Sequence, residues 1–212
     1  MADKSKVDLT KPLTLLIGLY VVSSFGLKFH ETQEIFIRLI PFDLAVTTAV
    51  LLYYQKHWNI RIIVYCFGVF VATLVIEAVG LQTGKIFGTY HYGRSLGPKV
   101  LDVPIVMGLA WLILVYCTGI MVKNLNFHYL VKAGIAAAMI VMFDVLMEPV
   151  AMKFGMWGWE NRRVPVLNYA AWFVISYIAL LTLLNLKAKL RNELAPYVFC
   201  IVSGFFLTIN LF

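Results

Sequence analysis

Three acidic residues lie inside long apolar stretches of this 212-residue chain, where a charge is expensive and usually serves a function. Glu77 lies near the end of one stretch, and Asp144 and Glu148 lie near the end of another. Because Asp144 and Glu148 are four residues apart, both project from the same face of a helix. Two carboxylates on one buried face cannot both carry charge cheaply, so we expect one neutral acid beside one carboxylate. Such a pair can protonate a substrate and then stabilise the cation produced.

The surroundings of Glu77 and Glu148 follow one pattern that occurs twice. Each Glu is followed by Phe-Gly-x-aromatic-x-aromatic, then by Val-Pro, then by a Trp seven residues after the Pro. Besides the Phe of each copy, the aromatic residues of the two copies are Tyr90, Tyr92, Trp111, Trp157, Trp159 and Trp172. Aromatic faces attract cations by about 0.5–2 kcal/mol each, so these rings are candidate walls of a pocket in which a carbocation develops.

Two further acids suggest a shorter third copy of the arrangement. Glu31 precedes Pro41, and Asp43 follows that Pro by two residues. We expect Pro41 to open the second helix, as the prolines of the two longer copies open theirs, and we expect both acids to lie beside the site. Proline at a helix start is common for backbone reasons, so this third copy is weaker evidence than the other two.

Each of these features also has a structural alternative. Glycines one and two turns after Glu77 could form a packing seam, with the Glu hydrogen-bonded across it. The aromatic residues could form a belt at the membrane interface. The acids of the second copy could form ion pairs across the following loop with Lys153, Arg162 or Arg163.

The composition identifies the elements that position these residues. The chain is 61% hydrophobic and 14% charged, whereas soluble domains are about 45–50% apolar and about 25% charged. A segment that spans a bilayer satisfies its backbone as a helix of about 20 residues. We therefore predict one all-α transmembrane domain over residues 1–212, a bundle of about seven helices built from repeated hairpins. The predicted spans are 13–28, 36–54, 60–79, 104–122, 130–150, 166–186 and 196–212.

The charges divide unevenly between the two faces that this topology creates. Ten Lys and Arg lie on the face of the N-terminus and eight on the other, which favours a cytoplasmic N-terminus in a plasma-membrane protein. Eight of the eleven carboxylates fall on that other face, together with both copies of the pattern. The net charge of +7 is scattered through short loops, which argues against a nucleic-acid partner. The four histidines form no cluster, which argues against a membrane di-iron oxygenase.

At these positions the chain resembles the carotenoid 1,2-hydratase family, and more distantly the small membrane lycopene cyclases. The resemblance extends over nearly the whole chain and is strongest from Glu77 to Trp172. It rests on two signatures. Their residues are Glu77, Gly80, Thr83-Gly84, Phe87-Gly88, Tyr90, Tyr92, Leu96-Gly97 and Val103-Pro104, then Asp144, Glu148-Pro149, Trp157-Gly158-Trp159, Val164-Pro165, Asn168-Tyr169 and Trp172.

The resemblance implies an enzyme that adds water to the terminal double bond of an acyclic ψ-end carotenoid, giving a tertiary alcohol without a redox cofactor or a metal. The implied partners are the carotenoid substrate in the bilayer, membrane lipids and other enzymes of carotenoid biosynthesis. We expect Glu148 or Glu77 to donate the proton and Asp144 to stabilise the cation or orient water, with Glu31 and Asp43 as further catalytic candidates. The residues expected to bind the end group are Tyr90, Tyr92, Trp111, Trp157, Trp159, Asn168 and Trp172.

Three other functions remain open at this point. The same protonation starts ring closure, so a carotenoid cyclase is the nearest alternative. A proton-coupled transporter also places acids within a membrane, although the two copies here have the same orientation and therefore lack the inverted symmetry of many carriers. A pigment-binding subunit without chemistry is the third alternative.

Overall fold

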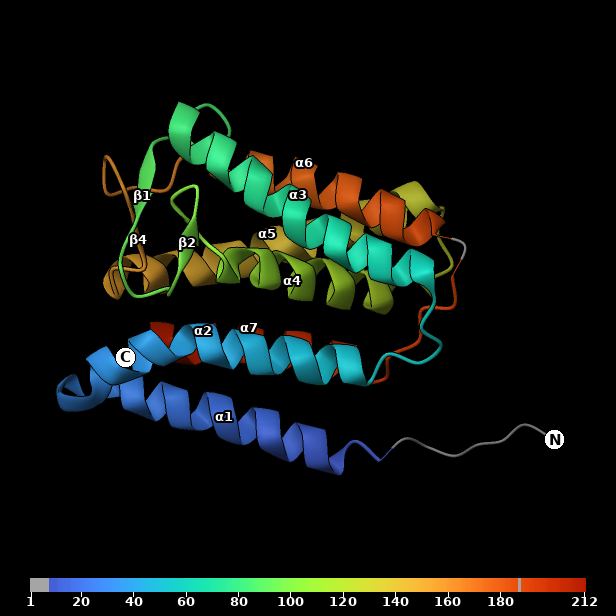
Figure 1. Ribbon diagram of the computed structural model, residues 1–212, viewed down its shortest axis with the longest axis horizontal. Helices are drawn as coiled ribbons and strands as arrows, with labels where there is room; N and C mark the ends of the chain where they lie inside the picture. The colour runs from blue at the N-terminus through green and yellow to red at the C-terminus, as the bar shows by residue number, and fades with distance from the viewer. Residues whose placement is uncertain (1–7, 187) are drawn as a thin grey trace.

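The computed structural model describes residues 8–186 and 188–212, which form seven helices and four short strands (Figure 1). The helices are α1 (Thr10–Lys28), α2 (His30–Tyr53), α3 (Ile60–Thr83), α4 (Val106–Val122), α5 (Tyr129–Lys153), α6 (Val166–Asn185) and α7 (Ala195–Asn210). The strands are β1 (Tyr90–Tyr92), β2 (Lys99–Val100), β3 (Val103–Pro104) and β4 (Trp157–Trp159). Asp3, Lys4, Lys6 and Lys187, which the charge comparison includes, lie outside the described residues.

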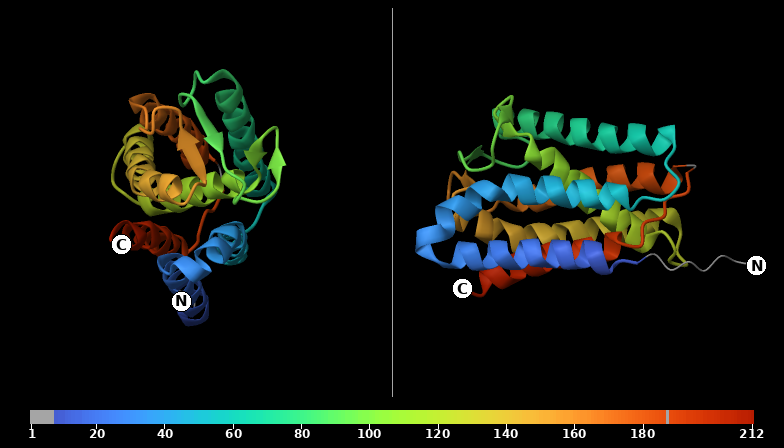
Figure 2. Two further views of the ribbon diagram at one scale, coloured as in Figure 1. Left: turned by 90° about the vertical axis from the view of Figure 1, so that its left-hand side faces the viewer. Right: turned by 60° about the horizontal axis from the view of Figure 1, so that its bottom comes forward.

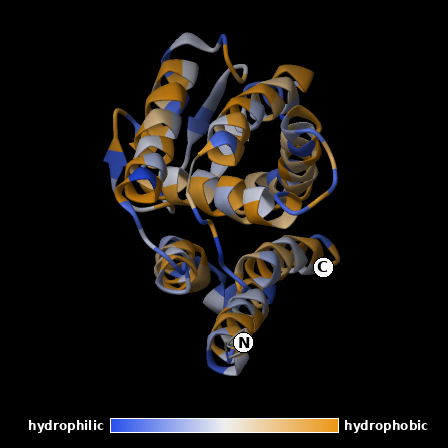
Figure 3. Cartoon of the chain, turned by 90° about the vertical axis from the view of Figure 1, so that its right-hand side faces the viewer, coloured by the Kyte–Doolittle hydropathy of each residue, from blue (hydrophilic) through white to orange (hydrophobic). Residues whose placement is uncertain are grey.

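The predicted all-α membrane bundle is confirmed. Five helices, α1, α2, α3, α5 and α6, are long and apolar enough to cross a membrane. Large apolar side chains such as Phe25, Phe67 and Ile178 are exposed, as a lipid-facing surface requires. The helices are hydrophobic along most of their length (Figure 3). The structure is that of a membrane protein.

Helix α4 forms the centre of the bundle. It packs against α2, α3, α5, α6 and α7, and 14 of its 17 residues are buried. A helix that is apolar all round is a core helix, so α4 can be shorter than the others without leaving polar backbone in lipid. Helix α7, with 16 residues, is likewise short and packs on α1, α4 and α5.

Two prolines lie inside helices, and the prediction that Pro41 opens the second helix is wrong. Helix α2 begins at His30 and contains Pro41, so Pro41 does not open it. The Gln33 amide donates to the Phe29 carbonyl at 3.0 Å and starts the helix there, with Glu31 in its first turn, where a negative charge suits the helix dipole. The first turns of α2 curve away from the rest of the helix (Figure 2), since Pro41 has no amide hydrogen to continue the bonding. Helix α5 likewise continues past Pro149 to Lys153.

A small antiparallel ribbon joins the two copies of the doubled pattern at one end of the bundle. Strand β1 pairs with β4 in the register Tyr90 with Trp159 and Tyr92 with Trp157. The ribbon lies across the ends of α3 and α5 (Figures 1 and 2). The prediction that both copies lie on the same face of the membrane domain is therefore confirmed.

Candidate active site

Glu77 is held by three side-chain donors. The Tyr90 and Tyr92 hydroxyls donate to its Oε2 at 2.6 and 2.9 Å, and the Trp111 indole donates to its Oε1 at 3.0 Å. The two tyrosines come from β1, and Trp111 comes from the first half of α4. The three hydrogen bonds favour the charged form of Glu77, whereas its burial opposes that form.

Glu148 is held in the same way by the second copy of the pattern. The indoles of Trp157 and Trp159 donate to its Oε2 at 3.0 and 2.8 Å. The Asn168 amide lies 3.4 Å from its Oε1, at the limit of a hydrogen bond, and takes the place that Trp111 has beside Glu77. Each glutamate is thus bonded by the two aromatic residues of its own copy and by one residue of the helix that follows.

The two copies face each other about a shared aromatic centre. Trp111 and Trp172, which occupy the same place in the pattern, stack with ring centroids 4.1 Å apart and planes 20° apart. Tyr90 and Trp159, which are paired across the ribbon, have ring centroids 5.1 Å apart. The repeat therefore builds one site from two similar halves.

Two positions break this similarity. Four residues before the Glu, the first copy has Thr73 and the second has Asp144; three residues after the Pro, the first has Met107 and the second has Asn168. Asn168 donates to Asp144 Oδ2 at 2.7 Å, whereas Asp144 Oδ1 is buried without a partner among the described residues. The second carboxyl group and the amide that bonds it are therefore on the Glu148 side only.

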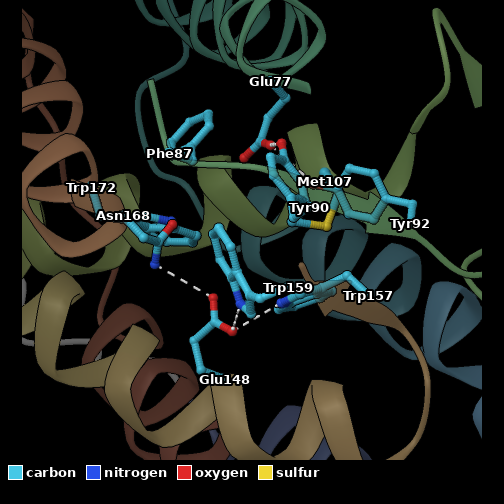
Figure 4. A pocket seen from close by; sticks show the side chains of 10 residues that line it. All are labelled: Glu77, Phe87, Tyr90, Tyr92, Met107, Glu148, Trp157, Trp159, Asn168 and Trp172. Carbon is cyan, nitrogen blue, oxygen red and sulfur yellow. Dashed lines mark hydrogen bonds between the residues drawn. The ribbon is translucent and has the colours of Figure 1, made fainter. Parts of the chain in front are cut away.

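A small cavity separates the two glutamates (Figure 4). About 20 Å³ of it is open to the centre of a water molecule, which is room for about one water. The residues that line it come from both copies: Glu77, Phe87, Tyr90, Tyr92, Met107, Glu148, Trp157, Trp159, Asn168 and Trp172. Met107 and Phe87 were not predicted as site residues. Phe87 belongs to the repeated motif and was available from it, but nothing in the sequence around Met107 indicated its position.

Most residues predicted for the site are brought together, and two are not. Eight predicted residues line the cavity, Trp111 donates to Glu77, and Asp144 is bonded to Asn168 behind Glu148. Asp43 is buried but accepts a hydrogen bond from the Ser23 hydroxyl at 2.6 Å, between α1 and α2. Glu31 is exposed in the first turn of α2. The tertiary structure does not bring these two acids to the cavity.

The donors to the glutamates favour a site over the structural alternatives. The indole and phenol groups of the ribbon bond carboxylates rather than forming an interfacial belt. Among the described residues the salt bridges are Arg38–Glu34, Lys56–Glu193 and Arg191–Glu193, so none involves Asp144 or Glu148.

Burial, together with the charge of Glu77, raises the pKa of Tyr90 and of Tyr92, which keeps both hydroxyls protonated as donors. Within the same part of the chain, no cluster of three or more His, Cys, Asp or Glu could hold a metal ion.

The fold and the site define a class: an all-α membrane protein in which two similar halves place buried acids around one small cavity. The chain belongs to the carotenoid biosynthesis protein family, whose model matches residues 39–211. This confirms the resemblance at the level of the family.

A curated relative is the bisanhydrobacterioruberin hydratase of Haloarcula japonica, which is 30% identical over 154 residues. The similar region covers 65% of this chain and 52% of that protein, so the chain spans about half the length of the relative. No solved structure matches the chain.

Proposed function

We propose that this protein hydrates the terminal carbon–carbon double bond of an acyclic carotenoid. The observation that carries the proposal is the pair of buried glutamates on either side of a cavity with room for about one water. Membership of a carotenoid biosynthesis family and similarity to a named hydratase support the same substrate class and reaction.

The different surroundings of the two glutamates support a division of roles. Glu77 accepts three hydrogen bonds and has no acidic neighbour on its helix one turn away, so it suits a permanent carboxylate that stabilises a cation. Glu148 has Asp144 one turn before it, and two carboxyl groups this close favour sharing one proton. We assign the transferable proton to this pair, with Glu148, which lines the cavity, as the donor.

The proposed reaction adds one water and consumes nothing else. The carboxyl proton of Glu148 goes to the less substituted carbon of the terminal alkene, and the alkene π electrons form the new C–H bond. This leaves a tertiary cation beside Glu77 and the aromatic walls. Each aromatic ring attracts the cation by about 0.5–2 kcal/mol. The oxygen of a water attacks the cation, and the proton that it releases returns to the Glu148 carboxylate. The acid is regenerated, and the product is a tertiary alcohol.

Hydration is favoured over cyclisation by the Asn168 side of the cavity. Asp144 Oδ1 has no partner among the described residues, and a buried carboxyl oxygen of this kind is a suitable acceptor for a water hydrogen bond. Ring closure needs water to be kept from the cation, and the polar side chain of Asn168, which lines the cavity and bonds Asp144, works against that. The substrate would enter from the bilayer, and we propose that the protein lies in the plasma membrane with its N-terminus in the cytoplasm.

Expression in a bacterium that makes lycopene or γ-carotene, followed by mass spectrometry of the pigments, tests the proposal. Hydration adds the mass of one water to the pigment, whereas cyclisation leaves the mass unchanged. The variants Glu77→Gln, Asp144→Asn and Glu148→Gln should form little product while they still accumulate in the membrane. Glu34→Gln is the matched control, because Glu34 is exposed and its ion pair with Arg38 lies on the surface. An absence of new pigment with both substrates, or full activity of all three amide variants, would contradict the proposal.

A further inference from the structure

A second cavity lies directly beside the one between the two glutamates. It is enclosed by side chains of α2, α4, α5 and α7, and its lining residues are apolar. About 40 Å³ of it is open to the centre of a water molecule, twice as much as in the cavity between the acids. Protein interiors leave few voids of this size, and an apolar one stays dry and accepts apolar ligands.

Two side chains separate this second cavity from the acids. Met107 and Trp157 line both cavities, so they form the wall between them. The Trp157 indole is fixed by its bond to Glu148, whereas no hydrogen bond from the described residues holds the Met107 side chain. Methionine has three rotatable side-chain bonds and fills irregular gaps, so rotation of Met107 can join the two cavities.

The second cavity can also adapt to an elongated ligand. Met147 of α5 and Met156, just before β4, line it together with Met107. Three flexible thioether side chains on one cavity allow it to widen without movement of the helices. A long, narrow hydrocarbon is the kind of ligand that such a space can admit.

The lining of the second cavity is partly exposed at one place. Leu44 of α2 and Ala110 of α4 are partly exposed, whereas the other residues that line the cavity are buried. In Figure 1, α4 is seen between α3 and α2, and the outer surface here faces the lipid of a membrane-spanning bundle. A ligand dissolved in the hydrocarbon core can therefore enter without crossing water.

We propose that the second cavity holds the hydrocarbon chain of a linear polyene, which enters between α2 and α4 at Ala110 and places its end group between the two glutamates past Met107. This proposal rests on the proposed hydratase function and specifies how the substrate reaches the site. The unequal halves of the repeat give the direction of approach. Met107 is apolar and faces the hydrocarbon chain of the polyene. Asn168, at the matching position of the other copy, is polar and lies on the side of the cavity where water is needed.

Ala110 offers a sharp test, because the repeat supplies its control. Ala110 lies six residues after the Pro of the first copy, and Ala171 lies six residues after the Pro of the second. Both alanines are partly exposed on their helices, but of the two only Ala110 lines the cavity. Ala110→Phe fills the entrance, and Ala171→Phe adds the same side chain without reaching it.

Two measurements should be made on Ala110→Leu, Ala110→Phe and Ala171→Phe: conversion of pigment in cells, and the amount of polyene that copurifies with each protein in detergent. We expect conversion to fall progressively from Ala to Leu to Phe at position 110, by at least about tenfold for Phe, corresponding to about 1.4 kcal/mol. Copurified polyene should fall in parallel, and Ala171→Phe should match the wild type in both measurements. If Ala110→Phe does not fold, the Leu variant and its copurified polyene decide the question.

Failure of this proposal can be distinguished from failure of the proposed function. If the wild type converts the pigment and the Ala110 variants convert and retain it equally well, the entry route is wrong and the hydratase function stands. If the wild type converts no pigment but retains polyene, and retention falls in the Ala110 variants, the cavity binds polyene and the hydratase function is wrong. Equal retention by all the proteins would overturn the cavity proposal in either case.

Discussion

Asn168→Leu gives the most direct test of how the site positions the water that attacks the cation. Asn168 is buried, and its amide donates to Asp144 Oδ2 at 2.7 Å and lies 3.4 Å from Glu148 Oε1. Leucine has the same branching at Cγ and no donor, so the change removes both contacts with little change of shape. The 3.4 Å contact contributes little at that length, and the shorter one is a hydrogen bond to an acidic group, worth about 1.5–3 kcal/mol.

If Asn168 and Asp144 together position the water, this loss appears in the rate of hydration. A change of about 1.5–3 kcal/mol corresponds to roughly a 10- to 150-fold slower conversion. The cation still forms, because Glu77 and Glu148 remain, so we also expect a larger share of products whose mass is unchanged. The assay is the rate and mass distribution of pigment formed by membranes that contain equal amounts of enzyme.

Asn185→Leu is the matched control for this experiment. Asn185 lies at the far end of the same helix and is exposed, and its amide donates to the Leu181 carbonyl one turn before it. It should convert pigment like the wild type. If Asn168→Leu also forms hydrated product at the wild-type rate, then Asn168 does not position the water, and the assignment of the two sides of the cavity is wrong.

Three further predictions follow from the contacts of the ribbon. Gly93→Ala should separate β1 from β4, because a Cβ there meets the Gly155 carbonyl. We expect thermal unfolding to show a loss of about 1–3 kcal/mol in stability. Gly68→Ala is the control and should have a much smaller effect, because a Cβ at that position has open space. Trp157→Phe and Trp159→Phe should each slow conversion, because each removes an indole hydrogen bond of about 1.5–3 kcal/mol. The slowing in the double variant, expressed as a free energy, should be less than the sum of the two single effects, since both indoles bond the same oxygen of Glu148. The pKa of Tyr90 and of Tyr92 is raised, so their contribution to stability is complete below the ordinary phenol pKa of about 10 and decreases as the pH rises above it. The variant Tyr92→Phe should therefore lose less thermal stability than the wild type between neutral and alkaline pH. An unchanged pH profile of thermal stability would contradict this.

The regular part of the fold was accessible from the sequence because it follows from the membrane alone. A long apolar stretch in a bilayer has to be a helix, so the number and approximate ends of the helices were predictable from composition. The exception is the first turns of α2, where polar residues from His30 to Glu34 hid a helical start and Pro41 suggested a later one. The repeated pattern also placed Glu77 and Glu148 at the same end of the bundle, since one helical hairpin separates them.

The contacts of the site could be read from the sequence only in part. Residues at matching positions of a repeat can be expected to have matching surroundings, and this made Trp111 and Trp172 comparable before their stacking was known. The direction in which the indoles and phenols point could not be predicted, because strands of three residues carry no periodicity that fixes their pairing or register. The separation of Asp43 from the site also depends on packing, since Ser23 of α1 supplies its partner.

The sequence by itself determined a helical membrane domain with two copies of one acid-and-aromatic pattern at one end, because the cost of burying backbone and charge in lipid leaves few other solutions. The tertiary structure alone decided that the copies pair through β1 and β4, that each glutamate is bonded by its own aromatic residues, and that Met107 faces an apolar cavity where Asn168 faces acids. These contacts join residues far apart in the chain. Their geometry depends on strand register and helix packing, which no local pattern specifies.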